Sequence, residues 1–294
     1  MTSYANPDFQ PKPFAAENLF ETSLETSGLK PRFTWLVPGP QRLYSPDAEN
    51  PSPKALLAAA AFRGLVQSPH FVCIAAQAAF KKGTFRIAHV DAEVGTWDSS
   101  IMLGYAMTRF IGDLATLPTP FRPLVVIFEG PTAASPEQFR DRFWSTLQQA
   151  SDIDALCFSP TREVDSKLTS PHFGYSIGQR GWFVNGSFPS APLIGRRTPL
   201  PTLICNLQSN FEQLKHSGQF VRIQKANTAR QLAVQGCVNP YLTELGGDAD
   251  QSVQFVSVPH GPGGCPFRRI SGSVGNRLGK MCRKVFRSGG KSEG

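Results

Sequence analysis

Hydrophobic and polar residues follow distinct patterns along the chain, and each pattern predicts a type of element. In residues 84–90, Phe85, Ile87 and His89 alternate with the remaining positions, which is typical of a half-buried strand. Residues 124–128 are apolar without a break, as expected for a strand buried on both faces. Both segments are therefore predicted to lie in a sheet.

Helical patterns occupy much of the remaining chain. They cover residues 53–65, 71–81, 99–114, 211–214 and 220–235. The clearest start signal is Ser135, a capping residue followed by Pro136 and Glu137 in the first turn. We expect this helix to run to about Ala150.

Three further segments look like strands, at residues 173–177, 181–185 and 202–207. The link Gly178-Gln179-Arg180-Gly181 joins the first two and predicts a hairpin. Strands and helices interleave without an internal repeat. The predicted fold class is therefore α+β, a mixed sheet flanked by helices in a single domain.

Composition predicts three parts of unequal character. Residues 1–52 are rich in Pro, Ser, Asn and Glu and are interpreted as an extended N-terminal arm that either wraps on the body or is loosely ordered. Residues 53–267 form the predicted domain. Residues 268–294 form a basic tail that holds eight basic residues against Glu293 alone, so +7 of the net charge of +8 lies there. The body is close to neutral, and no specific nucleic acid is expected as a partner.

Within the tail, Val274, Leu278, Met281 and Val285 recur at helical spacing among the basic residues. This pattern favours a basic amphipathic helix that contacts an anionic membrane or a partner. The alternative is a solvated, partly disordered tail, which the nearby glycines support.

Several classes of protein are disfavoured by what the sequence lacks. It has no apolar run of 18 residues and no secretory leader pattern, so a cytoplasmic location is predicted. Its six cysteines form no Cys-x-x-Cys pair, which argues against a zinc site or a disulfide framework. Glycine-rich nucleotide loops and the common hydrolase signatures are also missing.

Seven short motifs occur in an order that resembles one protein family. They are Phe71-x-Cys73-x-x-Ala76-x-x-Ala79, Phe143-Trp144-x-x-Leu147-Gln148 with Asp154, Phe173-x-x-Ser176 with Phe183, Arg196-Arg197, Asn206-x-x-x-x-Phe211-Glu212-x-Leu214 with Gly218, Gln235-Gly236-x-x-Asn239-Pro240 with Gln254, and Cys265-Pro266-Phe267. In sequence and spacing they resemble the YqcI/YcgG family over roughly residues 65–267.

The resemblance implies a function as well as a fold. Characterised members of that family are heme-dependent oxygenases that hydroxylate a guanidino nitrogen in specialised-metabolite pathways. By resemblance, this chain is expected to hydroxylate a nitrogen of an amino acid or related small molecule, with heme as cofactor and an unidentified reductant.

The chain also departs from the family pattern at five positions. The family has histidine at the positions of Ser151, Phe188 and Gln208, and arginine at those of Thr228 and Val253. Either a cysteine ligates the iron, or this relative has lost or changed the cofactor.

Two cysteines are candidate thiolate ligands of a heme iron. Cys73 follows the helix-start signal Ser68-Pro69, and a helix N-terminus favours the thiolate. Cys265 follows a Gly-Pro-Gly-Gly loop that allows close approach of a ligand. The alternatives are an apolar core thiol for Cys73 and a turn-anchoring thiol for Cys265.

Polar residues of the motifs are candidates for binding. Arg196 and Arg197 are suited to a carboxylate or a heme propionate, unless they are a solvated loop pair. Asn206 and Glu212 are candidate ligands of a cationic guanidinium, although Asn206 is also a candidate cap for the helix that contains Glu212. Asn239 either lines the pocket or makes a turn.

Two classes of function remain open. The first is the heme-dependent N-oxygenase. The second is a diverged relative without heme, with other chemistry in the same pocket or a binding role through its basic tail. A cysteine-nucleophile hydrolase that pairs Cys73 with His172 is a weaker third hypothesis.

Overall fold

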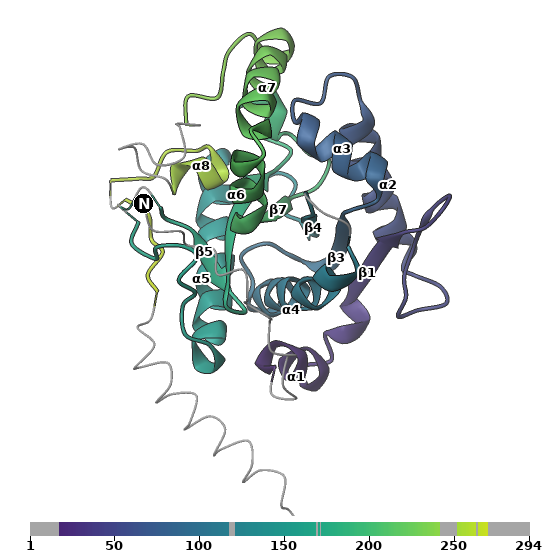
Figure 1. Cartoon of the computed structure of the whole chain (residues 1–294). Helices are drawn as coiled ribbons and strands as arrows, with labels where there is room; N and C mark the ends of the chain where they lie inside the picture. The colour runs from purple at the N-terminus through teal and green to yellow at the C-terminus, as the bar shows by residue number, and fades with distance from the viewer. Residues whose placement is uncertain are drawn as a thin grey trace, which may run out of the picture.

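The computed structural model describes residues 18–117, 121–168, 170, 172–241, 252–262 and 264–269 (Figure 1). Its strands are β1 (Phe33–Pro38), β2 (Leu43–Tyr44), β3 (Arg86–Glu93), β4 (Pro123–Gly130), β5 (Tyr175–Ile177), β6 (Arg180–Ser187) and β7 (Thr202–Leu207). Its α-helices are α1 (Leu19–Thr26), α2 (Pro53–Gln67), α3 (Ile74–Lys82), α4 (Trp97–Asp113), α5 (Pro136–Cys157), α6 (Gln208–His216), α7 (Gln219–Gln235) and α8 (Val253–Val256). Short 3-10 helices are η1 (Lys30–Arg32), η2 (Leu114–Thr116) and η3 (Ile194–Arg196).

The strands form one seven-stranded sheet in the order β2-β1-β3-β4-β7-β6-β5. Only the β3–β4 pair is parallel, and the other neighbours are antiparallel. A mixed sheet with helices on its faces confirms the predicted α+β class. The hairpin is confirmed too, since Gly178 and Gln179 both adopt positive φ in the tight turn between β5 and β6.

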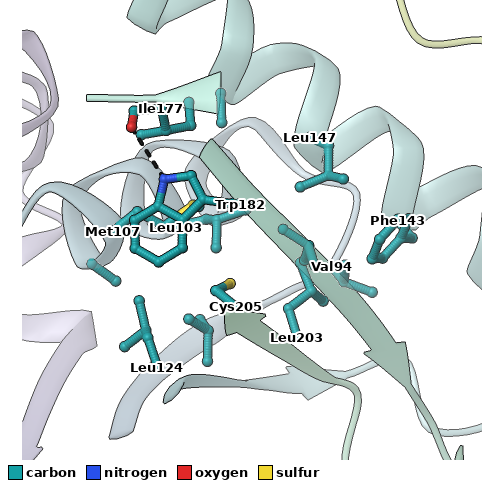
Figure 2. Close-up of a cluster of buried hydrophobic side chains, with 14 of the residues drawn as sticks. Val94, Leu103, Met107, Leu124, Phe143, Leu147, Ile177, Trp182, Leu203 and Cys205 are labelled. Atoms are coloured by element: carbon teal, nitrogen blue, oxygen red, sulfur yellow. Dashed lines mark hydrogen bonds between the residues drawn. The ribbon is translucent and has the colours of Figure 1, made fainter. Parts of the chain in front are cut away.

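Helices cover both faces of the sheet, and each face has its own core. On one face, α1, α4 and α5 enclose the larger core, in which Trp182 lies among aliphatic side chains and donates its Nε1–H to the Ile177 carbonyl at 3.1 Å (Figure 2). On the other face, α2 packs Phe62 and Val66 onto a smaller core. Adjacent residues of a strand serve opposite cores, as Ile87 and Ala88 do.

The predicted helix after Ser135 is confirmed in its start and is longer than expected. Ser135 and Gln138 form a reciprocal capping box. The helix passes Ala150 and ends at Cys157, because Ile153, Asp154 and Ala155 continue its buried face. The predicted end was too early because it was placed by the spacing of apolar residues, and Asp154 is a buried residue that is not apolar.

Residues 18–52 of the predicted arm pack on the body, as in the first of the two alternatives, and they contribute α1, β1 and β2. Phe20 and Leu24 of α1 are buried in the larger core, and β1 pairs with β3 through Trp35. The composition of this segment suggested an arm because its polar residues lie between these few large apolar anchors. The remainder of the predicted arm, residues 1–17, lies outside the described residues.

The first residues of the predicted basic tail also contact the body. The Arg269 guanidinium, with its side chain 4% exposed, pairs with the buried Asp154 carboxylate at 3.2 Å. The Gln148 side chain donates its Nε2–H to the Arg268 carbonyl and accepts the Arg268 N–H at its Oε1. The amphipathic pattern at 274–285 lies outside the described residues. Within the part of the chain that the structure describes, no helix is long and apolar enough to cross a membrane.

Candidate functional site

Cys73 lies at the start of α3, as its N-cap residue. The Asn227 side chain of α7 accepts the Ile74 N–H at 3.0 Å and so takes the place of a capping side chain. The cysteine is half-buried. Its sulfur is therefore held between the first turn of one helix and the middle of another.

The surroundings of the Cys73 sulfur act on its pKa in opposite directions. Burial raises the pKa of the thiol above its ordinary value, and this is the largest effect. Hydrogen bonds from the Ala76 and Ala75 N–H groups, the charge of Arg196 and the Asn227 side chain lower it. Four groups thus stabilise a thiolate, but burial keeps the resting thiol protonated.

Arg196 is the cation that faces this thiol. It ends η3, and its guanidinium donates to the carbonyls of Gly186 at 3.3 Å, Phe255 at 3.4 Å and Gln254 at 3.0 Å. Burial lowers its pKa to about 10, while Cys73 acts to raise it. The Arg196 side chain therefore links β6 to α8 by hydrogen bonds, and its charge acts on Cys73 at the start of α3. Among the described residues, no carboxylate forms an ion pair with it.

Close backbone packing positions η3 against the Cys73 loop. A Cβ at Gly195 would lie 2.9 Å from the Val72 side chain, which favours glycine there. The Gly195 N–H donates to the Gln235 side chain at 3.1 Å. Arg197, the next residue, is exposed and donates its Nε–H to the Ala191 carbonyl at 2.8 Å. The predicted arginine pair is thus divided, with only Arg196 beside the sulfur.

Asn239 is buried in a turn whose polar groups are all engaged. Its N–H donates to Gln231 at 2.7 Å, its Nδ2 donates to the Ser257 hydroxyl at 2.8 Å, and its Oδ1 accepts the Tyr241 N–H at 3.0 Å. This agrees with the turn-forming alternative. The turn stands next to α8, whose carbonyls contact Arg196.

Asn206 and Glu212 occupy separate environments. Asn206 is buried on β7, and its Nδ2 donates to the Ile204 carbonyl at 3.3 Å. Glu212 is on the surface of α6 and pairs with Lys215 at 3.2 Å. Since α6 takes Leu207 as its N-cap without a side-chain hydrogen bond, Asn206 does not cap this helix.

Cys265 lies in the larger core, with Phe267 of the same segment. Cys73 is beside Phe71 and Ala76, which pack on the smaller core across the sheet. The two cysteines therefore lie on different cores and do not form a pair. His172 is exposed and is not among the groups that act on Cys73.

Sequence reasoning missed the role of Asn227, and it placed His89 on a strand without foreseeing the partner of its side chain. Asn227 is one residue in a polar helix, and nothing in its spacing distinguishes it. His89, in contrast, occupies the same alternating positions as Phe85 and Ile87, and a histidine in an apolar pattern is a usable signal. Its side chain is 1% exposed and binds Glu129 at 2.5 Å. Burial lowers the pKa of His89, although the hydrogen bond to Glu129 raises it.

The donor set around Cys73 is compatible with a single thiolate ligand to iron and not with a metal held by several side chains. Among the described residues, no group of three or more His, Cys, Asp or Glu could hold a metal ion. A heme needs only one or two protein ligands. In its chemistry, the Cys73 sulfur with its four anion-stabilising neighbours fits such a ligand.

Comparison with known proteins gives one match. The model of the YqcI/YcgG family matches residues 62–268, which is more than half of the chain. The matched span contains Cys73, Arg196 and the turn at Asn239. No curated protein and no solved structure matches the chain.

Proposed function

The chain belongs to the YqcI/YcgG family, and on this premise we propose that it is an oxidoreductase that hydroxylates a nitrogen of an amino acid or a related small molecule. The observation that carries the proposal is the Cys73 sulfur, which interacts with two backbone N–H groups and an amide side chain and lies within the field of the Arg196 charge. This environment favours an anionic sulfur once a cation binds it.

In this proposal, heme bound at Cys73 supplies the activation of dioxygen. The chain's own groups have separate tasks. Asn227 fixes the start of α3 and with it the position of the sulfur. Arg196 offsets negative charge on the thiolate, because its cation lies in a poorly solvated place where charges interact strongly. Arg197, which is exposed beside it, is available to an anionic group of a ligand.

An absorption spectrum of the purified protein after heme supplementation tests this proposal. We expect a Soret band that shifts with carbon monoxide or imidazole, that Cys73→Ala abolishes and that Cys265→Ala retains. Loss of the band only in Cys265→Ala would move the ligand to the other core. A colourless wild-type protein would overturn the proposal.

A second candidate, a family member that works without heme, is favoured by one observation. At Phe188, where the family has histidine, the aromatic ring stacks on Phe139 with centroids 4.0 Å apart, inside the larger core. Apolar packing thus replaces a potential ligand. This candidate predicts a colourless protein in which Arg196 and Cys73 bind or transform a small polar molecule without iron.

A further inference from the structure

The helices on the two faces of the sheet carry opposite charge. Asn227 of α7 accepts the Ile74 N–H of α3, and one small cavity is lined by residues of α3, α6 and α7, so α6 and α7 lie beside α3 on the face of α2 and α3. These four helices have one acidic residue, Glu212, and eight basic residues: Lys54, Arg63, Lys81, Lys82, Lys215, Arg222, Lys225 and Arg230. We call them the basic layer.

The helices α1, α4 and α5 on the other face have the reverse balance. They contain three arginines, at positions 109, 140 and 142, and eight acidic residues: Glu21, Glu25, Asp98, Asp113, Glu137, Asp141, Asp152 and Asp154. The near-neutral charge of the body therefore conceals two layers of opposite sign. Such segregation creates a directed field that a neutral total does not reveal.

The cations of the two layers also differ in their partners. Each arginine of the acidic layer pairs with a carboxylate. Apart from Arg230, which donates to the Phe71 carbonyl and the Gln77 side chain, five cations of the basic layer have no carboxylate partner among the described residues: Arg63, Lys81, Lys82, Arg222 and Lys225. Their charge is thus available to an outside anion.

Four of these cations, Lys81, Lys82, Arg222 and Lys225, are exposed and belong to α3 and α7, which are in contact through Asn227. A small cavity of about 80 Å³ lies between α3, α6 and α7, with Lys82, Leu214 and Ile223 in its wall. Arg222 and Lys225 flank Ile223 in the sequence of α7 and are exposed. Lys82 therefore lies in the wall of a mostly apolar hollow, and the exposed Arg222 and Lys225 belong to a helix that forms part of the same wall.

Exposed aliphatic side chains accompany this charge. Leu57 on α2 is 74% exposed and Val221 on α7 is 56% exposed. The helices α2 and α3 run antiparallel, since the Phe62 and Phe80 rings lie 5.8 Å apart while Gln77 donates to the Val66 carbonyl. The apolar start of α2 therefore lies near the basic end of α3.

We propose that the basic layer is a docking surface for a membrane that contains anionic lipids. Lysine and arginine attract lipid phosphates and carboxylates, and neighbouring aliphatic side chains enter the boundary between head groups and acyl chains. A surface for single-stranded nucleic acid would present aromatic platforms instead, whereas the exposed large side chains of these helices are aliphatic.

Sedimentation of the full-length protein with vesicles tests this. The vesicles consist of phosphatidylcholine with or without phosphatidylserine. The layer variant combines Lys82→Gln, Arg222→Gln and Lys225→Gln. The matched control, Arg42→Gln with Arg162→Gln and Lys167→Gln, removes the same charge from exposed positions outside the layer.

We expect the wild type to bind only the vesicles with phosphatidylserine, with an affinity that falls as salt rises. The layer variant should bind at least ~10-fold more weakly than the wild type, and the control within about twofold of it. Both variants keep the basic tail, so their difference reports the layer alone.

Equal binding by the two variants would overturn the proposal and assign membrane contact to other positive charge. Binding to both kinds of vesicle, or to neither, would overturn it as well. If no vesicle binding is seen and only the layer variant loses a salt-sensitive self-association, the occupant is a second copy of the chain. If only the layer variant loses RNA binding instead, the occupant is nucleic acid.

Discussion

The helices α4 and α7 have the same length, 17 residues, and lie on opposite faces of the sheet (Figure 1). Eleven residues of α4 are buried, most of them apolar, and they fill the larger core. In α7 only Gln231 is buried. The first helix is fixed by burial of apolar surface, which is the largest favourable term in folding.

The helix α7 is held by polar side chains instead. Asn227 accepts the Ile74 N–H, Arg230 donates to the Phe71 carbonyl at 3.0 Å, Gln231 accepts the Asn239 N–H and Gln235 accepts the Gly195 N–H. Each of these contacts reaches a loop next to Cys73 or Arg196. The helices of the acidic layer therefore stabilise the sheet by apolar packing. The helices of the basic layer position the candidate site and carry exposed positive charge.

The largest expected effect separates the two layers by stability. Trp182→Ala should lower the free energy of unfolding by about 3–5 kcal/mol, since it leaves a cavity in the larger core. Val221→Ala on α7 should change it by less than about 0.5 kcal/mol because the side chain is exposed. Urea unfolding measures both. A similar loss in both variants would remove the distinction between the layers.

A glycine pair within α4 sharpens the role of close packing. A Cβ at Gly104 would lie 2.0 Å from the Phe20 ring, so Gly104→Ala should destabilise the protein by about 1–3 kcal/mol. Gly112 has open space around it, and Gly112→Ala should stabilise the helix by about 0.5–1 kcal/mol. Thermal unfolding compares them. A stabilising Gly104→Ala would show that α1 packs loosely on α4.

The buried carboxylate of α5 should make stability depend on pH. Burial raises the pKa of Asp154 to about 7 from an unfolded value of 3.8, against the opposing effects of Gly178 and Arg269. The folded protein then binds a proton that the unfolded chain releases. The resulting stability is complete below pH 3.8 and is lost as the pH rises through 7.

Asp154→Asn supplies the reference for this effect. Between about pH 5 and 8, the wild type should lose about 2 kcal/mol of unfolding free energy relative to Asp154→Asn. Chemical denaturation at both pH values measures the difference. A gain with rising pH would mean that the ion pair with Arg269 outweighs burial.

The last expected effect is modest and concerns the polar attachment of α7. Asn227→Ala leaves the Ile74 N–H without its acceptor and should cost about 1 kcal/mol. It also removes one group that lowers the pKa of the Cys73 thiol, so the pH profile of Cys73 alkylation should move upward. Peptide mass spectrometry follows the reaction, with the exposed Cys237 as internal control. An unchanged pH profile would show that Asn227 does not affect the pKa of the Cys73 thiol.

Much of the fold could be predicted because local signals agreed with tertiary packing. The unbroken apolar run at 124–128 became β4, which is buried on both faces, and Ser135 became the predicted cap. The helix and strands of the N-terminal segment were not predicted because Trp35 and Phe20 are separated by polar residues, and their partners in the fold lie far along the chain. Contacts between residues so far apart in sequence leave no hydrophobic periodicity within the segment itself.

The candidate site could be predicted only in part. The motifs named Cys73 and Arg196 separately, and the structure brings them together. The same motifs also named Cys265 and Glu212, which lie in other surroundings. Asn227, which caps the helix of Cys73 from a distance of 153 residues along the chain, gave no signal.

By itself, the sequence determined the family, the fold class and most of the elements, because periodicity and capping act over a few residues and ordered motifs are read along the chain. Only folding shows that the Cys73 thiol lies within the field of the Arg196 guanidinium, and that the near-neutral body divides into a basic and an acidic layer. Burial, pKa and surface charge depend on residues that are distant in sequence and adjacent only after folding.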